Sequence, residues 1–337
     1  MRSLLSLGEG GLLMKLIVPM ARKKVKDDSR FVPPNPLMNL VGRPILIRVL
    51  DVVKNLKISE VIFIVDRDDD DLKFLISKNF KFKVRFVLQK NQKGVAHAIF
   101  GARKFVSDEP CLVLFADSIV EADLKGLDKV KEDAVIWVKK VDDPRSFGVV
   151  FTHNGFVTRL IEKPETPISD LAMVGMYYFK NSALLFDSVA FLIKNKILTK
   201  GAFQITDALQ IMINKGASIV SKEVSSWLDC GSKKKLIESH KDIIFEQEFV
   251  ASQKGCVFIK PVFVEKGALV RDSIIGPNVS IAKNANVSRS IISDSIICEG
   301  ALVENEVLDS SFVGRRAKVY GSLRKINLKD RGVIGDE

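Results

Sequence analysis

The chain has few cysteines and no spacing among them that suggests a metal site. Its four cysteines, Cys111, Cys230, Cys256 and Cys298, lie far apart among 337 residues and form no C-x-x-C pair. A zinc site or a disulfide framework is therefore not expected, and a reducing cytoplasm fits this cysteine usage.

Long apolar runs are also missing. No run reaches the roughly 18 residues that a transmembrane helix needs, so we expect no membrane association. The first twenty residues have some apolar character, but Glu9 and three glycines interrupt them, and no signal-peptide cleavage site stands out. Because MKLIVPM reads as an opening strand, a natural start at Met14 fits at least as well as a signal peptide.

Charge is unbalanced towards the basic side, with a net charge of +11. Such an excess suits anionic partners, namely nucleotides, sugar phosphates or nucleic acid. The basic clusters at residues 22–26, 233–235 and 315–318 are short and lack interleaved aromatic residues. We therefore interpret them as solvated surface and expect no nucleic-acid binding.

What the chain does have is a regular alternation of strand and helix patterns from Lys15 to Ser118. Apolar residues make up 47% of the chain and charged residues 28%, which is typical of globular proteins. The length allows two domains. The alternation predicts βαβ units and an α/β fold with a mostly parallel sheet.

One crevice of this sheet is predicted to hold polar groups of three kinds. Asp117 follows the buried strand pattern of residues 112–115, and ligands of open α/β sheets lie beyond the carboxyl ends of strands. The preceding strand ends at Gln89, and the next helix begins near Gly94. An amide, a helix N-terminus and a carboxylate together predict a nucleotide and metal site. Taken alone, Asp117 equally fits an aspartate that caps the next turn.

The last part of the chain changes its periodicity. Beyond residue 250, apolar residues recur at every sixth position, as in Ile275, Ile281 and Val287, then Ile297 and Val303, then Val313 and Val319. This period predicts a parallel β-helix, in which stacked coils share one core. We expect two domains, residues 14–250 and 251–337.

Seven segments, in this order and spacing, resemble those of sugar-1-phosphate nucleotidyltransferases. They are QKNQKGVAHA from Gln89, LFADS, DPRSFGVV, IEKPE, LAMVGMYYF, ITDAL and WLDCGS from Trp227. The chain is most similar to long-form glucose-1-phosphate thymidylyltransferases, and the likeness extends from Lys15 to Glu337. It implies a Rossmann-like, mixed and mostly parallel sheet domain, followed by a left-handed β-helix.

The resemblance also implies a reaction. A sugar-1-phosphate oxygen attacks the α-phosphorus of a nucleoside triphosphate, and pyrophosphate leaves. By resemblance, Asp117 and Asp229 are catalytic and hold Mg²⁺, a hard cation that prefers oxygen ligands. Glucose-1-phosphate is the default sugar phosphate.

The same resemblance implies which residues bind the substrates. Gln89 reads the base, favouring dTTP or UTP, because an amide offers a donor and an acceptor together. Gly94 allows the backbone to approach the base. The residues implied at the sugar phosphate are Ser118, Gly148, Glu162, Lys163, Met173 and Gly175. Ser118 stands where thymidylyltransferases usually carry asparagine.

The phosphate loop departs from the family pattern. The family has a glycine-rich loop after its first strand, whereas residues 21–36 contain no glycine. Only Ser29-Arg30-Phe31 matches the end of that loop, so Arg30 is the candidate catalytic arginine. Asn35 replaces the lysine of a Lys-Pro-Leu element. An alternative is therefore a catalytically silent homologue that binds nucleotide-sugar and has a regulatory or scaffolding role.

A third interpretation makes the β-helix an acyltransferase. Such sites commonly use a histidine base, and all three histidines of the chain, at positions 97, 153 and 240, precede the β-helix. We therefore expect the β-helix to be structural and to assemble a homo-oligomer. His97 is expected to be a packed helix residue.

Overall fold

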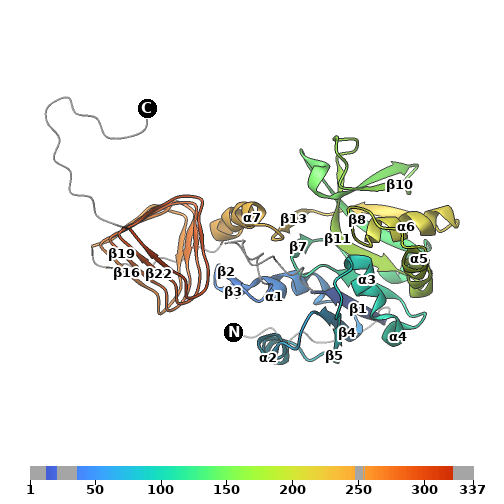
Figure 1. The fold of residues 1–337 in the computed structure, drawn as a ribbon, viewed down its shortest axis with the longest axis horizontal. Coiled ribbons are helices and arrows are strands. Elements are labelled where there is room, and N and C mark those ends of the chain that lie inside the picture. Colours follow the sequence, from blue (N-terminus) through green and yellow to red (C-terminus); the bar gives the residue numbers. More distant parts are fainter. Residues whose placement is uncertain (1–12, 21–35, 247–252, 254, 322–337) are drawn as a thin grey trace. The chain divides into compact units, whose positions relative to one another are not determined.

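The computed structural model describes residues 13–20, 36–246, 253 and 255–321 (Figure 1). They form two units, each with its own hydrophobic core. The first comprises the described residues up to 38 together with 43–232, and the second comprises 39–42 together with those from 233 onward. The predicted boundary after residue 250 follows helix α7 (Lys233–Glu246), which the structure groups with the second unit.

The first unit is built on a nine-stranded mixed sheet. Its strands are β1 (Met14–Pro19), β4 (Ile58–Val65), β5 (Val84–Leu88), β6 (Cys111–Leu114), β8 (Ala134–Lys140), β9 (Gly148–His153), β10 (Phe156–Glu162), β11 (Leu171–Phe179) and β12 (Ile219–Glu223). Their order across the sheet is β5-β4-β1-β6-β11-β8-β12-β10-β9. The first four are parallel neighbours, whereas β11 runs antiparallel to both β6 and β8.

Apolar side chains cover both faces of the central strands. Ile17 of β1, Ile62 of β4 and Val113 of β6 are completely buried in one core cluster. Such continuous apolar strands are typical of a sheet that helices cover on both sides. The helices of this unit are α1 (Ile45–Leu50), α2 (Asp70–Asn79), α3 (Val95–Phe100), α4 (Arg103–Val106), α5 (Ser182–Lys194) and α6 (Ile205–Asn214), with 3-10 turns η1 (Asp51–Val53), η2 (Leu127–Lys129) and η3 (Pro144–Ser146). None of the helices in the described ranges is long and apolar enough to cross a membrane.

A short antiparallel pair brings two distant segments together. β7 (Ser118–Glu121) pairs with β13 (Ser226–Asp229), and Ser118 lies opposite Asp229 in the register. A further two-stranded pair is formed by β2 (Asn39–Leu40) and β3 (Arg43–Pro44). The pairing of β7 with β13 fixes the carboxyl end of β6 next to the end of β13.

Three parallel four-stranded sheets form the β-helix of the second unit. The first contains β14 (Val257–Phe258), β17 (Ile274–Ile275), β20 (Ile291–Ile292) and β23 (Val307–Leu308). The second contains β15 (Val262–Val264), β18 (Val279–Ile281), β21 (Ile296–Ile297) and β24 (Phe312–Val313). The third contains β16 (Leu269–Arg271), β19 (Asn286–Ser288), β22 (Leu302–Glu304) and β25 (Lys318–Tyr320).

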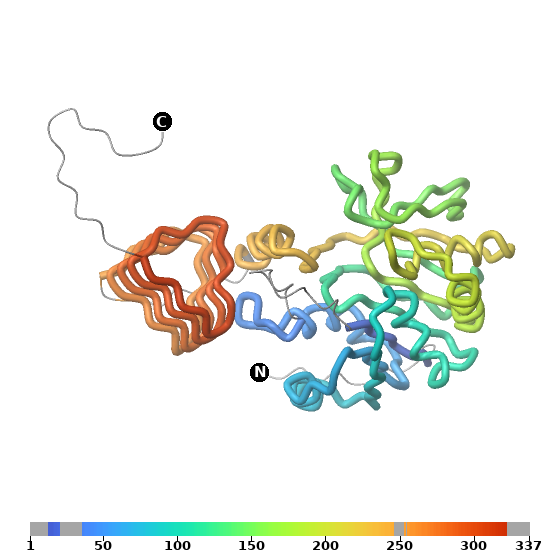
Figure 2. Tube along the Cα trace, in the orientation of Figure 1, coloured from blue at the N-terminus to red at the C-terminus, as the bar shows by residue number. Residues whose placement is uncertain are grey.

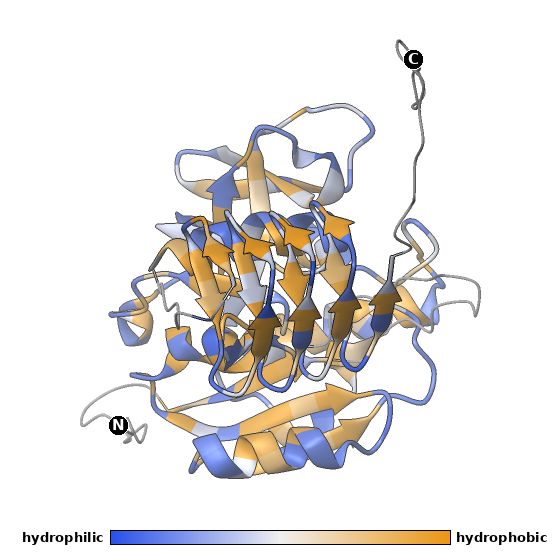
Figure 3. Ribbon diagram, turned by 90° about the vertical axis from the view of Figure 1, so that its left-hand side faces the viewer, coloured by the Kyte–Doolittle hydropathy of each residue, from blue (hydrophilic) through white to orange (hydrophobic). Residues whose placement is uncertain are grey.

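The six-residue period of the sequence corresponds to the three sides of this β-helix. Ile275, Ile281 and Val287 lie on β17, β18 and β19 in turn, and all three side chains are completely buried. Figure 2 shows the coils stacked one upon the next, and Figure 3 shows hydrophobic strands separated by hydrophilic turns. The predicted fold class, a mixed α/β domain followed by a left-handed β-helix, is confirmed.

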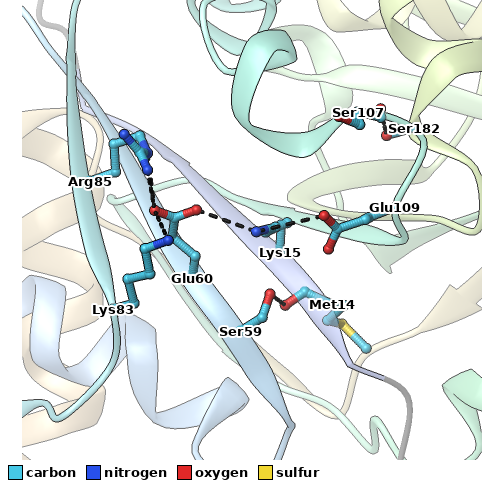
Figure 4. Close-up of polar contacts among 9 residues, drawn as sticks. All are labelled: Met14, Lys15, Ser59, Glu60, Lys83, Arg85, Ser107, Glu109 and Ser182. Atoms are coloured by element: carbon cyan, nitrogen blue, oxygen red, sulfur yellow. Dashed lines mark hydrogen bonds and ion pairs between the residues drawn. The ribbon is translucent and has the colours of Figure 1, made fainter.

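A buried charged cluster lies near the amino-terminal ends of β1, β4 and β5 (Figure 4). The Glu60 side chain accepts from Lys15 Nζ at 3.3 Å and from Arg85 Nε at 3.0 Å. Lys83 lies 3.6 Å from the same carboxylate, and Lys15 also reaches Glu109 at 3.7 Å. Burial alone would raise the pKa of Glu60, but the bond from Lys15 and the nearby positive charges outweigh it and lower the pKa.

The second unit contains a buried histidine. His240 of α7 is completely buried, and neither of its ring nitrogens has a partner among the described residues. Burial lowers its pKa to about 4, although the charge of Asp294 acts in the opposite direction. The ring is therefore neutral in the folded protein at neutral pH.

We expect His240 to weaken the fold as the pH falls from 6.5 towards 4. The unfolded chain binds a proton near pH 6.5, whereas the folded chain does not do so until about pH 4. The free energy of unfolding should therefore drop by roughly 3 kcal/mol more across this range than it does in His240→Met. Urea unfolding at several pH values measures this, with His153→Met, an exposed histidine, as the control. Parallel pH profiles for wild type and His240→Met would contradict it.

Candidate active site

Two aspartates converge at the carboxyl ends of β6 and β13. Asp117 follows β6, and the main-chain oxygen of Asp117 accepts from Cys230 N at 2.8 Å. Asp229 ends β13, and its Oδ1 accepts from Gly231 N at 2.7 Å. A Cβ built on Gly231 would lie 3.0 Å from both Asp117 Oδ2 and Asp229 Oδ1. The glycine therefore leaves room where the two carboxylates meet.

This donor set fits Mg²⁺. The cation prefers oxygen ligands and usually takes one or two carboxylates from the protein, with water and substrate phosphates completing the shell. Within the described ranges, no group of three or more His, Cys, Asp or Glu side chains is arranged to hold a metal. A cation held by Asp117 and Asp229 alone would therefore keep most of its coordination positions open to other oxygen ligands.

Ser118, the residue after Asp117, begins β7 and is buried. It lies opposite Asp229 in the pairing with β13. The structure therefore places this predicted substrate residue beside the carboxylates.

A second cluster lies at the ends of β9, β10 and β11. A Cβ built on Gly148 would lie 3.0 Å from Met173 Sδ, 3.2 Å from Glu162 Oε2 and 3.3 Å from Thr206 Oγ1. The structure thus brings together three residues predicted at the sugar phosphate, Gly148, Glu162 and Met173. The Thr206 hydroxyl also donates to Glu162 Oε2.

Lys163 and Gly175 flank this cluster in different ways. Lys163 is exposed, has a positive φ of 44° and donates its main-chain N–H to Phe147 O at 2.9 Å. Gly175 has φ of 82°, and a Cβ there would lie 2.8 Å from the Phe115 ring. The Gly175 oxygen accepts from Phe115 N at 2.9 Å. In the structure, Gly175 therefore permits close packing against the residue that follows β6.

A third cluster surrounds the end of β5. Gln89 is buried, and its Nε2 lies 2.9 Å from Nδ1 of His97 on α3. Both residues border a cavity of about 230 Å³, together with Asn91 and Ala98. Gly94 has φ of 119°, and a Cβ there would lie 2.4 Å from the Phe203 oxygen. Gly94 is thus required by the approach of the Phe203 main chain.

The Nucleotidyl transferase family model matches residues 29–246, more than half of the chain. The chain belongs to this family. Among curated relatives, glucose-1-phosphate thymidylyltransferase of Streptomyces griseus is 28% identical over 331 residues, which cover 89% of this chain and 91% of the relative.

Two further similar proteins match about 70% of the chain. Bifunctional protein GlmU of Methanocaldococcus jannaschii is 30% identical over 240 residues, covering 70% of this chain and 56% of the relative. A solved UDP-glucose pyrophosphorylase in complex with UDP-glucose superimposes with a TM-score of 0.57 at 19% identity. It covers 70% of this chain and all of that structure, and it shows the same fold.

Two residues that the sequence did not single out lie beside these clusters. Thr206 lies in the first turn of α6 and is 1% exposed. Tyr177 of β11 is buried, and burial, followed by the charges of Glu162 and Asp117, raises the pKa of its phenol. The charges of Asp117 and Glu162 therefore both act on this one ring, so the cluster around Asp117 and the cluster around Glu162 lie on either side of Tyr177.

Arg30, the candidate catalytic arginine, lies outside the described residues, as do Asn35 and the basic cluster at residues 22–26.

Proposed function

We propose that the protein transfers a nucleotidyl group from a nucleoside triphosphate, dTTP or UTP, to a sugar-1-phosphate, with glucose-1-phosphate as the first candidate. The bond between the α-phosphorus and the attacking sugar-phosphate oxygen forms while the bond to the leaving pyrophosphate breaks. The products are an NDP-sugar and pyrophosphate. The observation that carries the proposal is the convergence of Asp117 and Asp229 above Gly231. It agrees with the names of the Streptomyces thymidylyltransferase and of the UTP–glucose-1-phosphate uridylyltransferase AglF of Haloferax volcanii.

Each cluster has a separate task in this proposal. Asp117 and Asp229 would hold Mg²⁺, which supplies charge neutralisation at the phosphates. Glu162, oriented by Thr206, accepts hydrogen bonds from sugar hydroxyls, and Lys163 offers its charge to the sugar phosphate. Gln89 contacts the base. Arg30 is our candidate for steadying the α-phosphate.

Pyrophosphate release tests the proposal. The purified chain is mixed with Mg²⁺, glucose-1-phosphate and each of dTTP, UTP, GTP, CTP and ATP, with mannose- and N-acetylglucosamine-1-phosphate as further acceptors. We expect release with dTTP or UTP. Binding of UDP-glucose or dTDP-glucose by calorimetry, without release from any pair of substrates, would instead support the silent homologue with a regulatory role.

We also propose that the β-helix assembles a homo-oligomer. Val257, Ile274, Ile291 and Val307 are aligned in one parallel sheet, and their side chains are 38–74% exposed. This aliphatic ladder carries no charge on a chain with a net charge of +11. Two like-charged copies can approach there with the least repulsion and bury apolar surface against the same ladder of the other copy.

Ile291→Asp is therefore expected to shift the protein towards its 37.5 kDa monomer. The substitution places a charge at the centre of the ladder, where contact with a second copy would bury it. Light scattering after size exclusion measures the mass. Leu269→Asp, an equally exposed position on the third sheet, is the matched control. A wild-type monomer, or an oligomer that Ile291→Asp leaves intact, would exclude the ladder as the interface.

A further inference from the structure

The side chain that fixes the orientation of Gln89 comes from helix α3. Gln89 Nε2 lies 2.9 Å from His97 Nδ1, and Gln89 N donates to Val65 O at 2.7 Å. Gln89 is 7% exposed, so its amide has few alternative partners in water. One N–H of the amide is thereby occupied by the imidazole.

The imidazole itself is held in place. Its ring stacks on Phe203, with 6.3 Å between the ring centroids and 20° between the planes. The Phe203 main chain is bonded to the start of α3, because Phe203 N donates to Lys93 O at 2.9 Å and Ala96 N donates to Phe203 O at 3.1 Å. This clamp keeps Nδ1 directed at Gln89.

The surroundings of the imidazole favour its neutral form. Burial, followed by the charge of Lys93, lowers the pKa of His97 below its ordinary value. A neutral ring with its proton on Nε2 accepts at Nδ1, whereas a protonated ring only donates. Because the Gln89 nitrogen faces Nδ1, a neutral His97 carries its proton on Nε2, takes an N–H of Gln89 and leaves Oε1 free to accept.

We infer that His97 is a positioning residue, which orients the Gln89 amide and so makes the site select uracil or thymine over cytosine. This rests on the proposed function, in which Gln89 reads the base. With one N–H on His97, the other N–H and Oε1 stand side by side. That pair matches the carbonyl oxygen and N3–H of uracil or thymine. Cytosine presents an amino group and an unprotonated N3, and it needs the amide turned over.

Binding of dTTP, UTP and CTP in the presence of Mg²⁺, measured by calorimetry, tests the inference in three proteins. His97→Phe keeps an aromatic ring against Phe203 but removes the acceptor. His97→Asn supplies an oxygen in place of Nδ1. We expect wild type and His97→Asn to prefer dTTP or UTP over CTP, and His97→Phe to lose about tenfold of that preference. A merely structural role would weaken all three nucleotides alike.

Either of two results would overturn the inference. One is His97→Phe that keeps the wild-type preference, and the other is a wild type that binds CTP as well as dTTP and UTP. Two further measurements distinguish a failure of this inference from a failure of the proposed function. They are nucleotide binding by Gln89→Ala and pyrophosphate release by wild type. Suppose that wild type releases pyrophosphate, that Gln89→Ala loses the preference for dTTP or UTP, and that His97→Phe keeps it. The proposed function would then hold, and only the positioning role of His97 would be excluded.

Discussion

Asp117→Asn is expected to lower the turnover of pyrophosphate release about a thousandfold, and Asp229→Asn is expected to do the same, because each removes several kcal/mol of charge stabilisation from the reaction. Asparagine keeps the size of the side chain and one oxygen, so Asp229→Asn can still accept from Gly231 N. What is lost is one of the two carboxylate charges that meet beside Gly231.

The design of this experiment separates a metal role from a folding role. Asp108→Asn makes the same substitution at an exposed aspartate that precedes β6, at the opposite end of the strand from Asp117. It should retain full activity. The double variant should be hardly slower than either single variant, because ligands that act as one unit are not additive. Thermal unfolding of each variant checks the fold. Asp117→Asn with turnover within about tenfold of wild type would exclude this carboxylate as a metal ligand.

Much of the fold follows from local patterns. Residues 61–65 and 111–114 are uniformly apolar, and they form the buried parallel strands β4 and β6. The six-residue period fixes the β-helix, because each coil must place an apolar residue on every side. The antiparallel direction of β11 was not predicted. Its nine residues are almost all buried, and an apolar run of this kind fits a parallel and an antiparallel neighbour equally well.

The candidate site was predictable where a polar residue follows a strand. Asp117 follows the buried strand β6, and Gln89 directly follows β5, so their positions at the carboxyl ends of parallel strands could be read from the sequence. Thr206 and Tyr177 could not be found in this way. Whether a side chain in the first turn of a helix meets Glu162 depends on how α6 packs against β10, which is set by contacts far apart in the sequence. The bond between His97 and Gln89 depends in the same way on the rotation of α3.

Glu60→Gln is expected to lower the free energy of unfolding by about 3 kcal/mol, because it leaves a buried lysine without its charged partner. Lys15 has a side chain only 13% exposed, and its other carboxylate, Glu109, is farther away at 3.7 Å. The charge of Arg85 loses less stabilisation in Glu60→Gln, since its guanidinium also lies 4.2 Å above the Phe105 ring and is partly exposed. Urea unfolding monitored by circular dichroism measures the change.

A second variant shows whether the loss of stability in Glu60→Gln comes from the unpaired charge of Lys15. Replacing both partners, as in Lys15→Met with Glu60→Met, should recover most of the stability, because a buried ion pair contributes little more than apolar residues of similar size. Turnover per folded molecule should remain as in wild type, since the cluster lies near the amino-terminal ends of the strands and the candidate site near their carboxyl ends. A double variant as unstable as Glu60→Gln would show that packing, and not charge, is responsible.

The pH dependence distinguishes Glu60 from His240. The lowered pKa of Glu60 means that its contribution is fully present above about pH 4.5, the ordinary value, and is lost as the pH falls through the value in the folded protein. The stability difference between wild type and Glu60→Gln should therefore be constant from pH 8 down to about pH 5 and shrink only below that. The loss of stability caused by His240 begins at a higher pH, from pH 6.5 downward. A loss of stability in wild type between pH 6.5 and 5 that Glu60→Gln shares and His240→Met lacks would thus assign that loss to the histidine.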